Sequence, residues 1–496
     1  MQERHSELIN VSQMYKADAA AVTAGVSGTT LMENAGQAIF DAIVARWTPR
    51  PLLVLCGPGN NGGDGFVVAR LLKAAGWNVD LALLGEASRL TGDAAHHAKL
   101  WTGEVLAFDP VVIEDKALIV DALFGAGLSR PLDGRAAMMV RAVNRAVGQG
   151  SSKVIAVDVP SGISGDSGAV LGDLCLTAEL TVSFFRPKVG HLLLPGRDAA
   201  GELVVADIGI PDAVLDSLKI ACHRNDPAIW RDSFPRRSSS SHKYTAGHAL
   251  VLGGSEMTGA ARLGARAALR IGAGLVSIAA ASTALQIYAL SSASVITLAC
   301  DSVDELENLL RDPRKNAVLI GPGYGTNELL RELVLAILRR DRATVLDADA
   351  LSIFGADPQS LFNALGSNVV LTPHDGEFRH LFPDMTGDRL SRARSAAARS
   401  GAIVVLKGSD TVISEPGGRA VINDNAPPYL ATAGSGDVLA GLILGLLAQG
   451  MPPFDAAAAA VWMHGELGRS LGAGLISEDL PERLPQVLSS LLKSFS

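Results

Sequence analysis

The stretch Leu52-Leu53-Val54-Leu55-Cys56-Gly57-Pro58-Gly59-Asn60-Asn61-Gly62-Gly63-Asp64-Gly65 decides the fold of the first half of the chain. Its apolar start predicts a buried strand at Leu52–Cys56, and the following residues, Phe66–Ala75, predict a helix. A glycine-rich loop between a strand and a helix suits a diphosphate at the helix N-terminus. The spacing is not the Gly-x-Gly-x-x-Gly dinucleotide fingerprint, so this loop alone is a weak signal.

Similar alternation of apolar runs and Ala/Leu-rich helical stretches continues to about Gly209 and restarts near residue 246. The predicted strands are Leu52–Cys56, Val79–Leu84, Ala117–Val120, Val154–Val157, Leu180–Phe184, His248–Leu252, Gly274–Ala280, Ala317–Ile320, Ala343–Leu346, Asn368–Leu371 and Ile403–Leu406. Helices are predicted at Gly259–Ile271 and Glu328–Arg339 among others. Between the two series, the polar run Pro235–Ser241 cannot bury a face. We therefore predict two α/β domains with parallel sheets, at residues 1–220 and 246–496, and a linker at 221–245.

Composition favours an enzyme that acts on small molecules. The 496 residues exceed the usual limit for one core, and 48% are hydrophobic but only 5% aromatic. A net charge of −8 argues against a nucleic-acid or anionic-membrane surface. The N-terminus lacks an apolar signal core, and no stretch of about twenty apolar residues is uninterrupted. The four cysteines show no Cys-x-x-Cys pair. We expect a cytoplasmic protein with no nucleic-acid or membrane partner.

Polar side chains follow three predicted strands of the first half. Asn61 lies in the glycine-rich loop, Asp121 follows Ala117–Val120, and Asp158 and Ser161 follow Val154–Val157. The carboxyl ends of parallel strands share one edge of a sheet, so these groups are expected to converge on one crevice. Their oxygens suit a hard cation such as potassium or magnesium. The alternative is that each Asp caps its own turn.

In the second half, Thr432-Ala433-Gly434-Ser435-Gly436-Asp437 leads directly into the apolar stretch Val438–Gly445. Small residues at the start of a helix allow several backbone N–H groups to converge on a phosphate, where the helix dipole favours negative charge. Asp437, in the first turn, is then a candidate general base toward a hydroxyl. Helix capping alone would also explain an acidic residue there, but would not require the glycines.

Other predicted strand ends of the second half carry glycines or polar groups that could line the same site. They are Gly253-Gly254-Ser255 with the helix start Gly259-Ala260, Gly321–Gly325, Asp347–Leu351, Leu371–Glu377 and Lys407-Gly408-Ser409-Asp410-Thr411. Each is weak alone. Together at successive strand ends they predict a nucleotide and substrate site.

The first half resembles the NAD(P)H-hydrate epimerase family. The resemblance rests on Val11–Met14 with Ala17-Asp18, Leu31–Gly36, Gly57–Gly65 and Val157–Gly162, and it covers residues 10–215. It implies a Rossmann-like fold and interconversion of the R and S epimers of the hydrated cofactors NADHX and NADPHX, with Asp158 as the candidate acid/base. It further implies potassium binding by Asn61, Asp121 and Ser161, and substrate binding by Asn60, Asn61, Gly62, Gly63, Asp64, Gly125, Ala126, Gly127, Leu128, Ser129, Arg130, Pro131 and Asp158.

Residues 240–490 resemble the ribokinase-like superfamily and, within it, the ADP- or ATP-dependent NAD(P)H-hydrate dehydratases. In that family a phosphoryl group passes from the nucleotide to the hydrate's hydroxyl, and elimination restores NAD(P)H. The resemblance implies that Asp437 deprotonates the hydroxyl and that ADP binds with magnesium. The hydrate would contact Ala260, Gly323, His374 and Asp437, and the nucleotide would contact Lys407, Gly408, Ser409, Asp410, Thr411 and Gly436. Ala426–Tyr429 and Tyr244 depart from the family pattern.

These resemblances predict a fused repair enzyme, an isomerase joined to a lyase that releases AMP and phosphate from ADP. A homo-oligomer is also expected. The alternative is a ribokinase-like kinase of a small alcohol, joined to an N-terminal nucleotide sensor without catalytic activity. It would use the same Asp437 but would release a stable phosphate ester.

Overall fold

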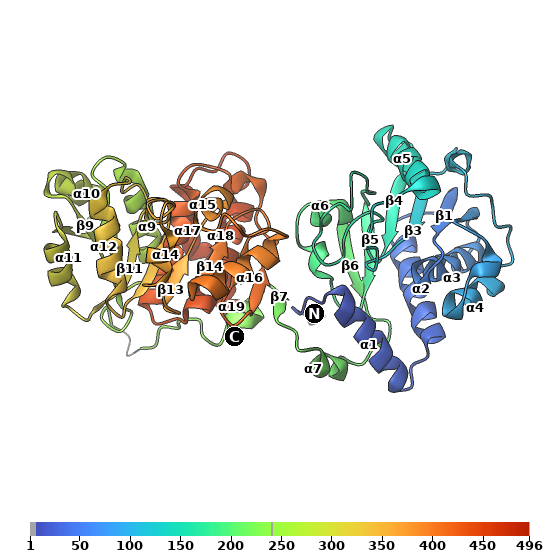
Figure 1. Ribbon diagram of the computed structural model, residues 1–496, viewed down its shortest axis with the longest axis horizontal. Coiled ribbons are helices and arrows are strands. Elements are labelled where there is room, and N and C mark those ends of the chain that lie inside the picture. Colours follow the sequence, from blue (N-terminus) through green and yellow to red (C-terminus); the bar gives the residue numbers. More distant parts are fainter. Residues whose placement is uncertain (1–5, 240–241, 496) are drawn as a thin grey trace. The chain divides into compact units, whose positions relative to one another are not determined.

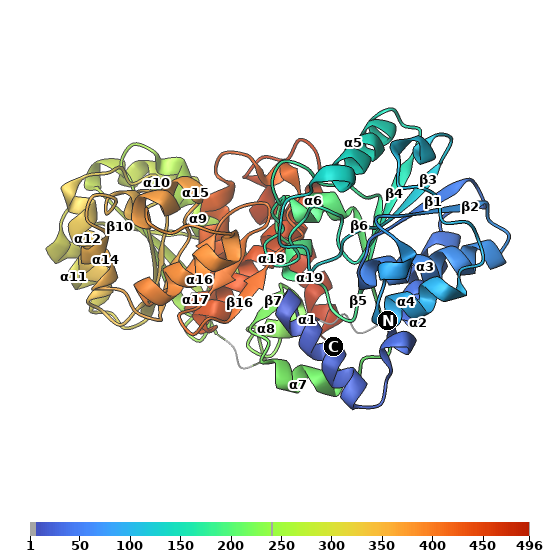
Figure 2. The ribbon, with the colours of Figure 1, turned by 45° about the vertical axis from the view of Figure 1, so that its right-hand side comes forward.

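The computed structural model describes residues 6–239 and 242–495 and divides the chain into two compact units, residues 1–222 and 223–496. Each unit is built on its own sheet (Figures 1 and 2). Ser240 and Ser241 of the predicted linker, and residues 1–5 of the predicted first domain, lie outside the described residues. No helix in the described part of the chain has the length and apolarity needed to cross a membrane.

The first unit contains a six-stranded parallel sheet in the order β2-β1-β3-β4-β5-β6. Its strands are β1 (Leu52–Cys56), β2 (Val79–Leu83), β3 (Leu118–Ala122), β4 (Lys153–Val157), β5 (Leu180–Phe184) and β6 (Glu202–Ala206), and its helices are α1 (Val11–Thr23), α2 (Gly28–Val44), α3 (Asn60–Ala74), α4 (Gly92–Leu100), α5 (Gly134–Gly148), α6 (Gly196–Ala200) and α7 (Leu215–Leu218). The chain leaves β1 toward β2 on one side and reaches β3 on the other. This reversal of direction opens a crevice at the carboxyl ends of β1 and β3.

Side chains of β1 alternate between two hydrophobic cores, as strand geometry requires. Leu52, Val54 and Cys56 pack into the core shared with α1, α2 and α3, whereas Leu53 and Leu55 pack into the core shared with α5. All five are buried. Burial on both faces explains why this strand is a continuous apolar run.

The second unit contains a ten-stranded sheet in the order β10-β9-β8-β11-β12-β13-β14-β15-β16-β7. Its strands are β7 (Cys222–Arg224), β8 (His248–Gly253), β9 (Leu275–Ala280), β10 (Ile296–Ala299), β11 (Lys315–Ile320), β12 (Ala343–Leu346), β13 (Val369–Leu371), β14 (Ile403–Leu406), β15 (Val412–Ser414) and β16 (Ala420–Ile422). The strands from β10 to β14 are parallel, and β15 pairs antiparallel with both β14 and β16.

Twelve helices accompany this sheet in the described part of the second unit. They are α8 (Pro227–Trp230), α9 (Thr258–Ile271), α10 (Leu285–Ser291), α11 (Val303–Leu310), α12 (Glu328–Leu338), α13 (Asp349–Ser352), α14 (Pro358–Phe362), α15 (Asp375–Leu381), α16 (Arg389–Ser400), α17 (Ser435–Ala448), α18 (Pro453–Leu471) and α19 (Asp479–Ser494). The nearly wholly buried α17 packs against α9 through small residues: a Cβ on Gly441 would stand 2.2 Å from the Gly264 carbonyl oxygen. This close approach keeps the start of α17 at the strand ends.

The α/β class is confirmed, but several predicted boundaries were wrong. Asn60–Gly65, predicted as loop, form the first turns of α3, and Asp121, predicted to follow its strand, lies within β3. The strands β6, β7, β10, β15 and β16 were not predicted, because short or partly exposed strands carry little apolar signal.

Part of the predicted linker packs against the second unit and belongs to it. The side chain of Asn225 donates to Asn423 Oδ1 at 3.0 Å and to the Ala458 carbonyl at 2.8 Å. Trp230 is 1% exposed and packs against Trp462 and Phe495. The composition of this segment gives no sign of these contacts, because the partner residues lie about two hundred or more positions later in the chain.

Candidate active sites

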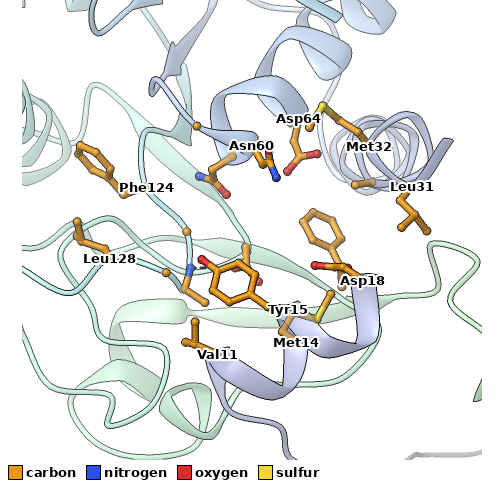
Figure 3. Close-up of a pocket in the computed structure, with 18 of the residues that line it drawn as sticks. Val11, Met14, Tyr15, Asp18, Leu31, Met32, Asn60, Asp64, Phe124 and Leu128 are labelled. Carbon is orange, nitrogen blue, oxygen red and sulfur yellow. Dashed lines mark hydrogen bonds between the residues drawn. The ribbon is translucent and has the colours of Figure 1, made fainter. Parts of the chain in front are cut away.

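A cavity of about 610 Å³ lies in the first unit, where β1, β3 and β4 end and α1 and α2 pass (Figure 3). Ten predicted substrate residues line it: Asn60, Asn61, Asp64, Gly125, Ala126, Gly127, Leu128, Ser129, Arg130 and Asp158. Apolar side chains of Val11, Met14, Leu31 and Met32 complete the wall. The cavity therefore combines an apolar surface with carboxylates, as expected for a site that holds a ring and acts on it.

Three other predicted substrate residues, Gly62, Gly63 and Pro131, do not line the cavity. A Cβ on Gly62 would stand 1.9 Å from the Gly57 carbonyl oxygen, and one on Gly63 would stand 2.5 Å from Met32 Sδ. Pro131 lies against Gly172, whose added Cβ would stand 3.0 Å from the ring. The glycines therefore allow α3 to start close to β1 and α2, and their backbone shapes the cavity from behind.

Asp158 is held as an ionised carboxylate. It accepts the Ala126 N–H at 2.9 Å and the Ser183 hydroxyl at 3.0 Å, and its Oδ1 lies 2.8 Å from Lys188 Nζ. Burial alone would raise the pKa of Asp158, but the Lys188 ammonium and these hydrogen bonds outweigh it and hold the pKa below its usual value. The group is ready to accept a proton.

Lys188 is the residue of this site that the sequence analysis missed. Its side chain is 1% exposed, and its ammonium donates to Ser183 Oγ at 3.0 Å and to the Phe184 carbonyl at 3.2 Å, besides the ion pair with Asp158. It stands in Pro187–Gly190, four residues beyond the end of β5. A lysine outside any apolar or glycine-rich pattern carries no signal in the sequence, although a loop after a parallel strand is where one could have been sought.

The predicted metal ligands Asp121 and Ser161 lie together. The Ser161 hydroxyl donates to Asp121 Oδ1 at 2.7 Å and its N–H donates to Oδ2 at 2.8 Å. Burial raises the pKa of Asp121 to about 6, opposed only by hydrogen bonds from Ser161 and Leu123. Asn61 lies on the other side of the β3 loop: a Cβ on Gly125 would stand 2.7 Å from its Oδ1.

In the second unit, the start of α17 forms the predicted phosphate nest. Gly434 is the N-cap with φ of 85°, and Ser435, Gly436 and Asp437 form the first turn. A left-handed glycine at this point turns the chain so that the free N–H groups of the helix face one spot. Ser435 Oγ lies 3.0 Å from His464 Nε2, which fixes the hydroxyl beside the nest.

Lys407 and Asp437, which carry opposite charges, both lie beside this nest. Lys407 Nζ lies 2.7 Å from Asp347 Oδ1 and 3.9 Å from Glu377 Oε2, and a Cβ on Gly436 would stand 3.7 Å from it. Burial and the charge of Asp347 raise the pKa of Asp437 to about 6, while Lys407 lowers it. The end of β14 thus brings the cation Lys407, and the end of β12 brings the carboxylate Asp347, next to Asp437 at the start of α17.

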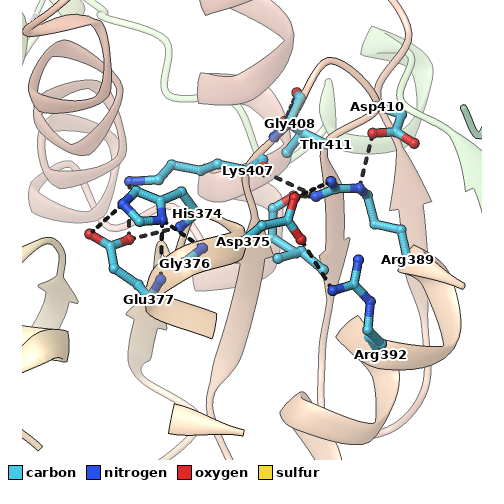
Figure 4. A network of polar contacts seen from close by, with 11 residues as sticks. His374, Asp375, Gly376, Glu377, Arg389, Arg392, Lys407, Gly408, Asp410 and Thr411 are labelled. Carbon is cyan, nitrogen blue, oxygen red and sulfur yellow. Dashed lines mark hydrogen bonds and ion pairs between the residues drawn. The ribbon is translucent and has the colours of Figure 1, made fainter. Parts of the chain in front are cut away.

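His374 caps α15 at the end of β13 and pairs with Lys407 in a short parallel bridge. Its Nδ1 accepts the N–H groups of Gly376 at 2.9 Å and Glu377 at 3.1 Å (Figure 4). The side chain is 59% exposed, and its other nitrogen, Nε2, lies 3.5 Å from Glu377 Oε1. The first turn of its own helix thus orients both nitrogens of His374.

The loop after β14 is held from behind by Arg389. Its guanidinium donates to the Lys407 carbonyl at 3.0 Å and pairs with Asp410 at 2.9 Å and with Asp375 (Figure 4). Thr411 Oγ1 closes the turn by donating to the Gly408 carbonyl at 2.7 Å. Asp410 and Thr411 thus shape the loop, while the exposed Gly408 and Ser409 lie at its surface.

Ala260 and Gly323 meet at the ends of β8 and β11. Gly323 has φ of 61°, and a Cβ there would stand 2.5 Å from the Met257 carbonyl and 3.1 Å from the Ala260 Cβ. Gly325 donates its N–H to Asp349 Oδ2 at 2.8 Å, which ties this loop to the start of α13. Only small residues allow the loop after β11 and the start of α9 to pack this closely.

Comparisons with known proteins agree with both halves. Residues 249–488 match the family model described as NAD(P)H-hydrate dehydratase, and residues 28–190 match the one described as YjeF-related protein N-terminus. The bifunctional NAD(P)H-hydrate repair enzyme Nnr of Moorella thermoacetica is 36% identical over 94% of this chain and 93% of its own length. The protein of the same name from Thermofilum pendens is 35% identical over 96% of this chain and 95% of its own length.

Among solved structures, the second unit is similar to the ADP/ATP-dependent NAD(P)H-hydrate dehydratase from Bacillus subtilis, co-crystallized with ATP/Mg2+. The two are 28% identical with a TM-score of 0.47, and the alignment covers 54% of this chain and 98% of that one. The full-length matches decide the relationship, because they span both units with one kind of protein. The chain belongs to the family of bifunctional NAD(P)H-hydrate repair enzymes.

Proposed function

We propose that this protein restores hydrated nicotinamide cofactors in two steps. The first unit interconverts the R and S epimers of NADHX and NADPHX, and the second dehydrates the S epimer to NAD(P)H at the expense of a nucleotide, with ADP giving AMP and phosphate. The observation that carries the proposal is Asp437 in the first turn of the buried helix α17, beside Lys407. This is the arrangement that phosphoryl transfer to a hydroxyl requires.

In the dehydratase step, Asp437 accepts the hydroxyl proton of the hydrate while the hydroxyl oxygen attacks the terminal phosphorus. The Gly436 N–H and the Lys407 ammonium stabilise the charge on the moving phosphoryl group, and AMP leaves with the electrons of the broken P–O bond. The hydroxyl thereby becomes a phosphate leaving group. Loss of phosphate, together with a proton from the adjacent ring carbon, restores the dihydronicotinamide ring. We expect His374, Ala260 and Gly323 to contact the hydrate, and Lys407–Thr411 with Gly436 to contact the nucleotide and its magnesium.

In the epimerase step, Asp158 accepts an O–H proton at the ring carbon that carries the hydroxyl, and the C–H bond of that carbon stays intact. Its ion pair with Lys188 keeps it charged inside a cavity where an isolated carboxylate would be protonated. The wall of Gly125–Arg130 and the first turn of α3 hold the rest of the substrate.

The residues Asn61, Asp121 and Ser161 fit a potassium ion. Asp121 is wholly buried with no cationic side chain among the causes of its pKa. All three residues offer oxygen, which hard cations prefer. When bound, potassium would neutralise Asp121 and fix the loop after β3. Exchange of potassium for tetramethylammonium is expected to slow epimerisation and leave dehydration unchanged.

The experiment that tests the whole proposal follows the absorbance of dihydronicotinamide. A mixture of R and S NADHX is incubated with ADP, with ATP or with neither, for the wild type and for Asp437→Asn and Asp158→Asn. We expect complete recovery only with a nucleotide, none with Asp437→Asn, and recovery of the S half alone at full rate with Asp158→Asn.

Failure with both nucleotides would contradict the dehydratase assignment. A stable phosphate ester among the products would instead favour the small-alcohol kinase, and full-rate recovery of both epimers with Asp158→Asn would make the first unit a binding module.

A further inference from the structure

The cavity of the first unit holds a second buried carboxyl that the steps above do not use. Asp64 lies in the second turn of α3, is 9% exposed and lines the cavity. Across the ranges 6–239 and 242–495, its carboxyl makes no hydrogen bond and no ion pair, and Figure 3 shows it turned into the cavity. An unpartnered carboxyl in such a place costs free energy that a purely structural residue would not need.

Several ionisable groups face Asp64 from the elements around it. They are Asp18 of α1, Cys56 of β1, Asp93 of α4, Asp158 after β4 and Lys188 after β5. The only cation in this group, Lys188, is already paired with Asp158. Three carboxyls, Asp18, Asp64 and Asp158, thus interact around one ammonium, so they cannot all be ionised at low cost.

The surroundings of Asp64 and Asp158 shift the pKa values of these two carboxyls in opposite directions. Burial raises the pKa of Asp64 well above its usual value, and the charges of Asp158 and Asp18 raise it further. The pKa of Asp158 is held below its usual value, chiefly because Lys188 outweighs the effect of burial. At a pH between these two pKa values Asp64 carries a proton and Asp158 does not, the condition for paired acid and base catalysis.

We propose that Asp64 is the proton donor of the epimerase site and acts as a pair with Asp158, the proton acceptor. This inference rests on the proposed epimerase function. It assigns a catalytic role to a residue that the sequence pointed to only as a substrate contact.

The hydroxyl-bearing carbon can invert if its ring C–N bond or its C–O bond breaks and re-forms, and both routes use this pair. If the ring C–N bond breaks, Asp158 takes the hydroxyl proton, the O–H electrons form the C=O bond, the C–N electrons go to nitrogen, and Asp64 protonates that nitrogen. Closure on the other face reverses both transfers. If the C–O bond breaks, the Asp64 proton leaves with the hydroxyl as water, the nitrogen lone pair forms C=N, and water adding to the other face gives its proton to Asp158. Asp158 then releases this proton to solvent and Asp64 takes one up, which restores the pair.

The test uses the full chain with Asp64→Asn, which keeps the size of the side chain and removes the acidic proton. We expect epimerisation kcat to fall on the order of 10²–10⁴-fold with KM changed only a few-fold, while dehydration of the S epimer stays at the wild-type rate. The wild-type epimerase rate should decline as pH rises through the Asp64 pKa, and this basic limb should disappear in the variant. Infrared spectra recorded below the pH of this basic limb should show a protonated carboxyl in the wild type and lose it in Asp64→Asn.

Asp18→Asn is the comparison variant, because Asp18 is the other carboxyl of the cavity with a raised pKa, to about 6 through burial. We expect it to retain the basic limb. Loss of that limb in Asp18→Asn, or a wild-type rate and unchanged infrared band in Asp64→Asn, would overturn the assignment. Absence of epimer exchange in the wild type itself would overturn the epimerase function and this inference together, so the two failures are distinguishable.

Discussion

Both candidate sites place a strained residue where a strand ends. Asp158 has φ of 64° and its carbonyl bonds His191 Nε2 at 2.8 Å, and Ala348, between Asp347 and Asp349, has φ of 50°. Residues other than glycine rarely adopt this region, which costs on the order of 1–3 kcal/mol. The strain turns the side chain of Asp158 toward the β3 loop and separates Asp347, paired with Lys407, from Asp349, which binds Gly325. In each site the backbone itself directs the carboxylates.

Lys188→Met should move the pH profile of epimerisation. Without the ammonium, Asp158 would be a buried unpaired charge, which costs about 3–5 kcal/mol. Protonation is cheaper, because each pKa unit corresponds to about 1.4 kcal/mol. The acid limb of kcat, below which Asp158 is protonated, should therefore shift to higher pH, by about two units or more.

Rate against pH for both epimers measures that shift. Lys188→Arg, which keeps the charge, should restore most of the profile. An unshifted acid limb in Lys188→Met would mean that Lys188 does not set the charge of Asp158.

Dehydration should show an acid limb near pH 6. Asp437 must be ionised to accept a proton, and burial together with Asp347 raises its pKa to about 6. Activity is therefore lost as pH falls through that value, and the rate reaches its full value above it. The profile of kcat/KM for the S epimer provides the measurement, with Asp437→Glu as the variant that should keep a limb at a changed position. A flat profile between pH 5 and 8 would argue against Asp437 as the base.

At the scale of elements, both sites depend on glycines at helix starts, used for two different purposes. In α3, Gly62 and Gly63 allow close packing against backbone and side chains, whereas Gly59 has open space at its Cβ position. In α17, Gly434 supplies a left-handed N-cap and Gly436 leaves room beside Lys407. These differences lead to predictions for matched pairs of variants.

Gly62→Ala should destabilise the first unit and slow the epimerase, and Gly59→Ala, whose Cβ meets no protein atom within 4 Å, should leave the stability unchanged. The new methyl of Gly62→Ala would meet the Gly57 carbonyl at 1.9 Å, and a backbone atom cannot move aside as a flexible side chain could. We expect a loss of about 1–3 kcal/mol in the stability of the first unit together with slower epimerisation. Thermal unfolding and epimer exchange measure both effects. Equal behaviour of the two variants would contradict the packing argument.

Gly436→Ala should weaken nucleotide binding without weakening the fold. In the free protein the added Cβ would meet only Lys407 Nζ, at 3.7 Å, and alanine favours a helix over glycine by about 0.5–1 kcal/mol. A phosphate seated in the nest would meet the methyl, so Kd for ADP should rise about ten-fold or more.

Gly434→Ala is the contrasting variant. It should destabilise the protein, since φ is 85° and the Cβ would stand 2.7 Å from Leu263 Cδ1. Calorimetric titration and unfolding separate the two effects. Undiminished ADP affinity in Gly436→Ala would place the phosphate elsewhere.

At the scale of the whole molecule, each unit has its own sheet, its own core and its own candidate site. The residues named for epimerisation all lie before residue 222, and those named for dehydration all lie after residue 223. Neither set borrows a residue from the other. The two reactions should therefore be separable by point substitution.

Two single-site variants should complement each other when mixed. Asp158→Asn retains dehydration and Asp437→Asn retains epimerisation, so an equimolar mixture should restore complete recovery of NADHX at about half the wild-type rate per chain. Each variant alone is the control. Failure of the mixture, with each remaining activity intact, would show that the substrate must pass between sites of one molecule.

The sequence by itself determined the α/β class, the approximate position of the central strands and the glycine-rich start of α17, but it assigned the glycines at the start of α3 to a loop. Those features are local: a buried parallel strand is a continuous apolar run, and a left-handed or closely packed position selects glycine. The same local signals placed Asp158 and Asp437 at strand and helix ends. They could not place β7 or α8, whose order comes from contacts with distant segments.

Only the tertiary structure decided which charges meet. Lys188 reaches Asp158 across the end of the sheet, Asp64 has no hydrogen-bond or ion-pair partner among the described residues, and Lys407 pairs with Asp347 sixty positions away. The ionisation of each carboxyl follows from burial and from these neighbours, quantities that depend on distances in space. For this reason the sequence pointed to where the sites lie, whereas the folded chain assigned which groups hold the protons.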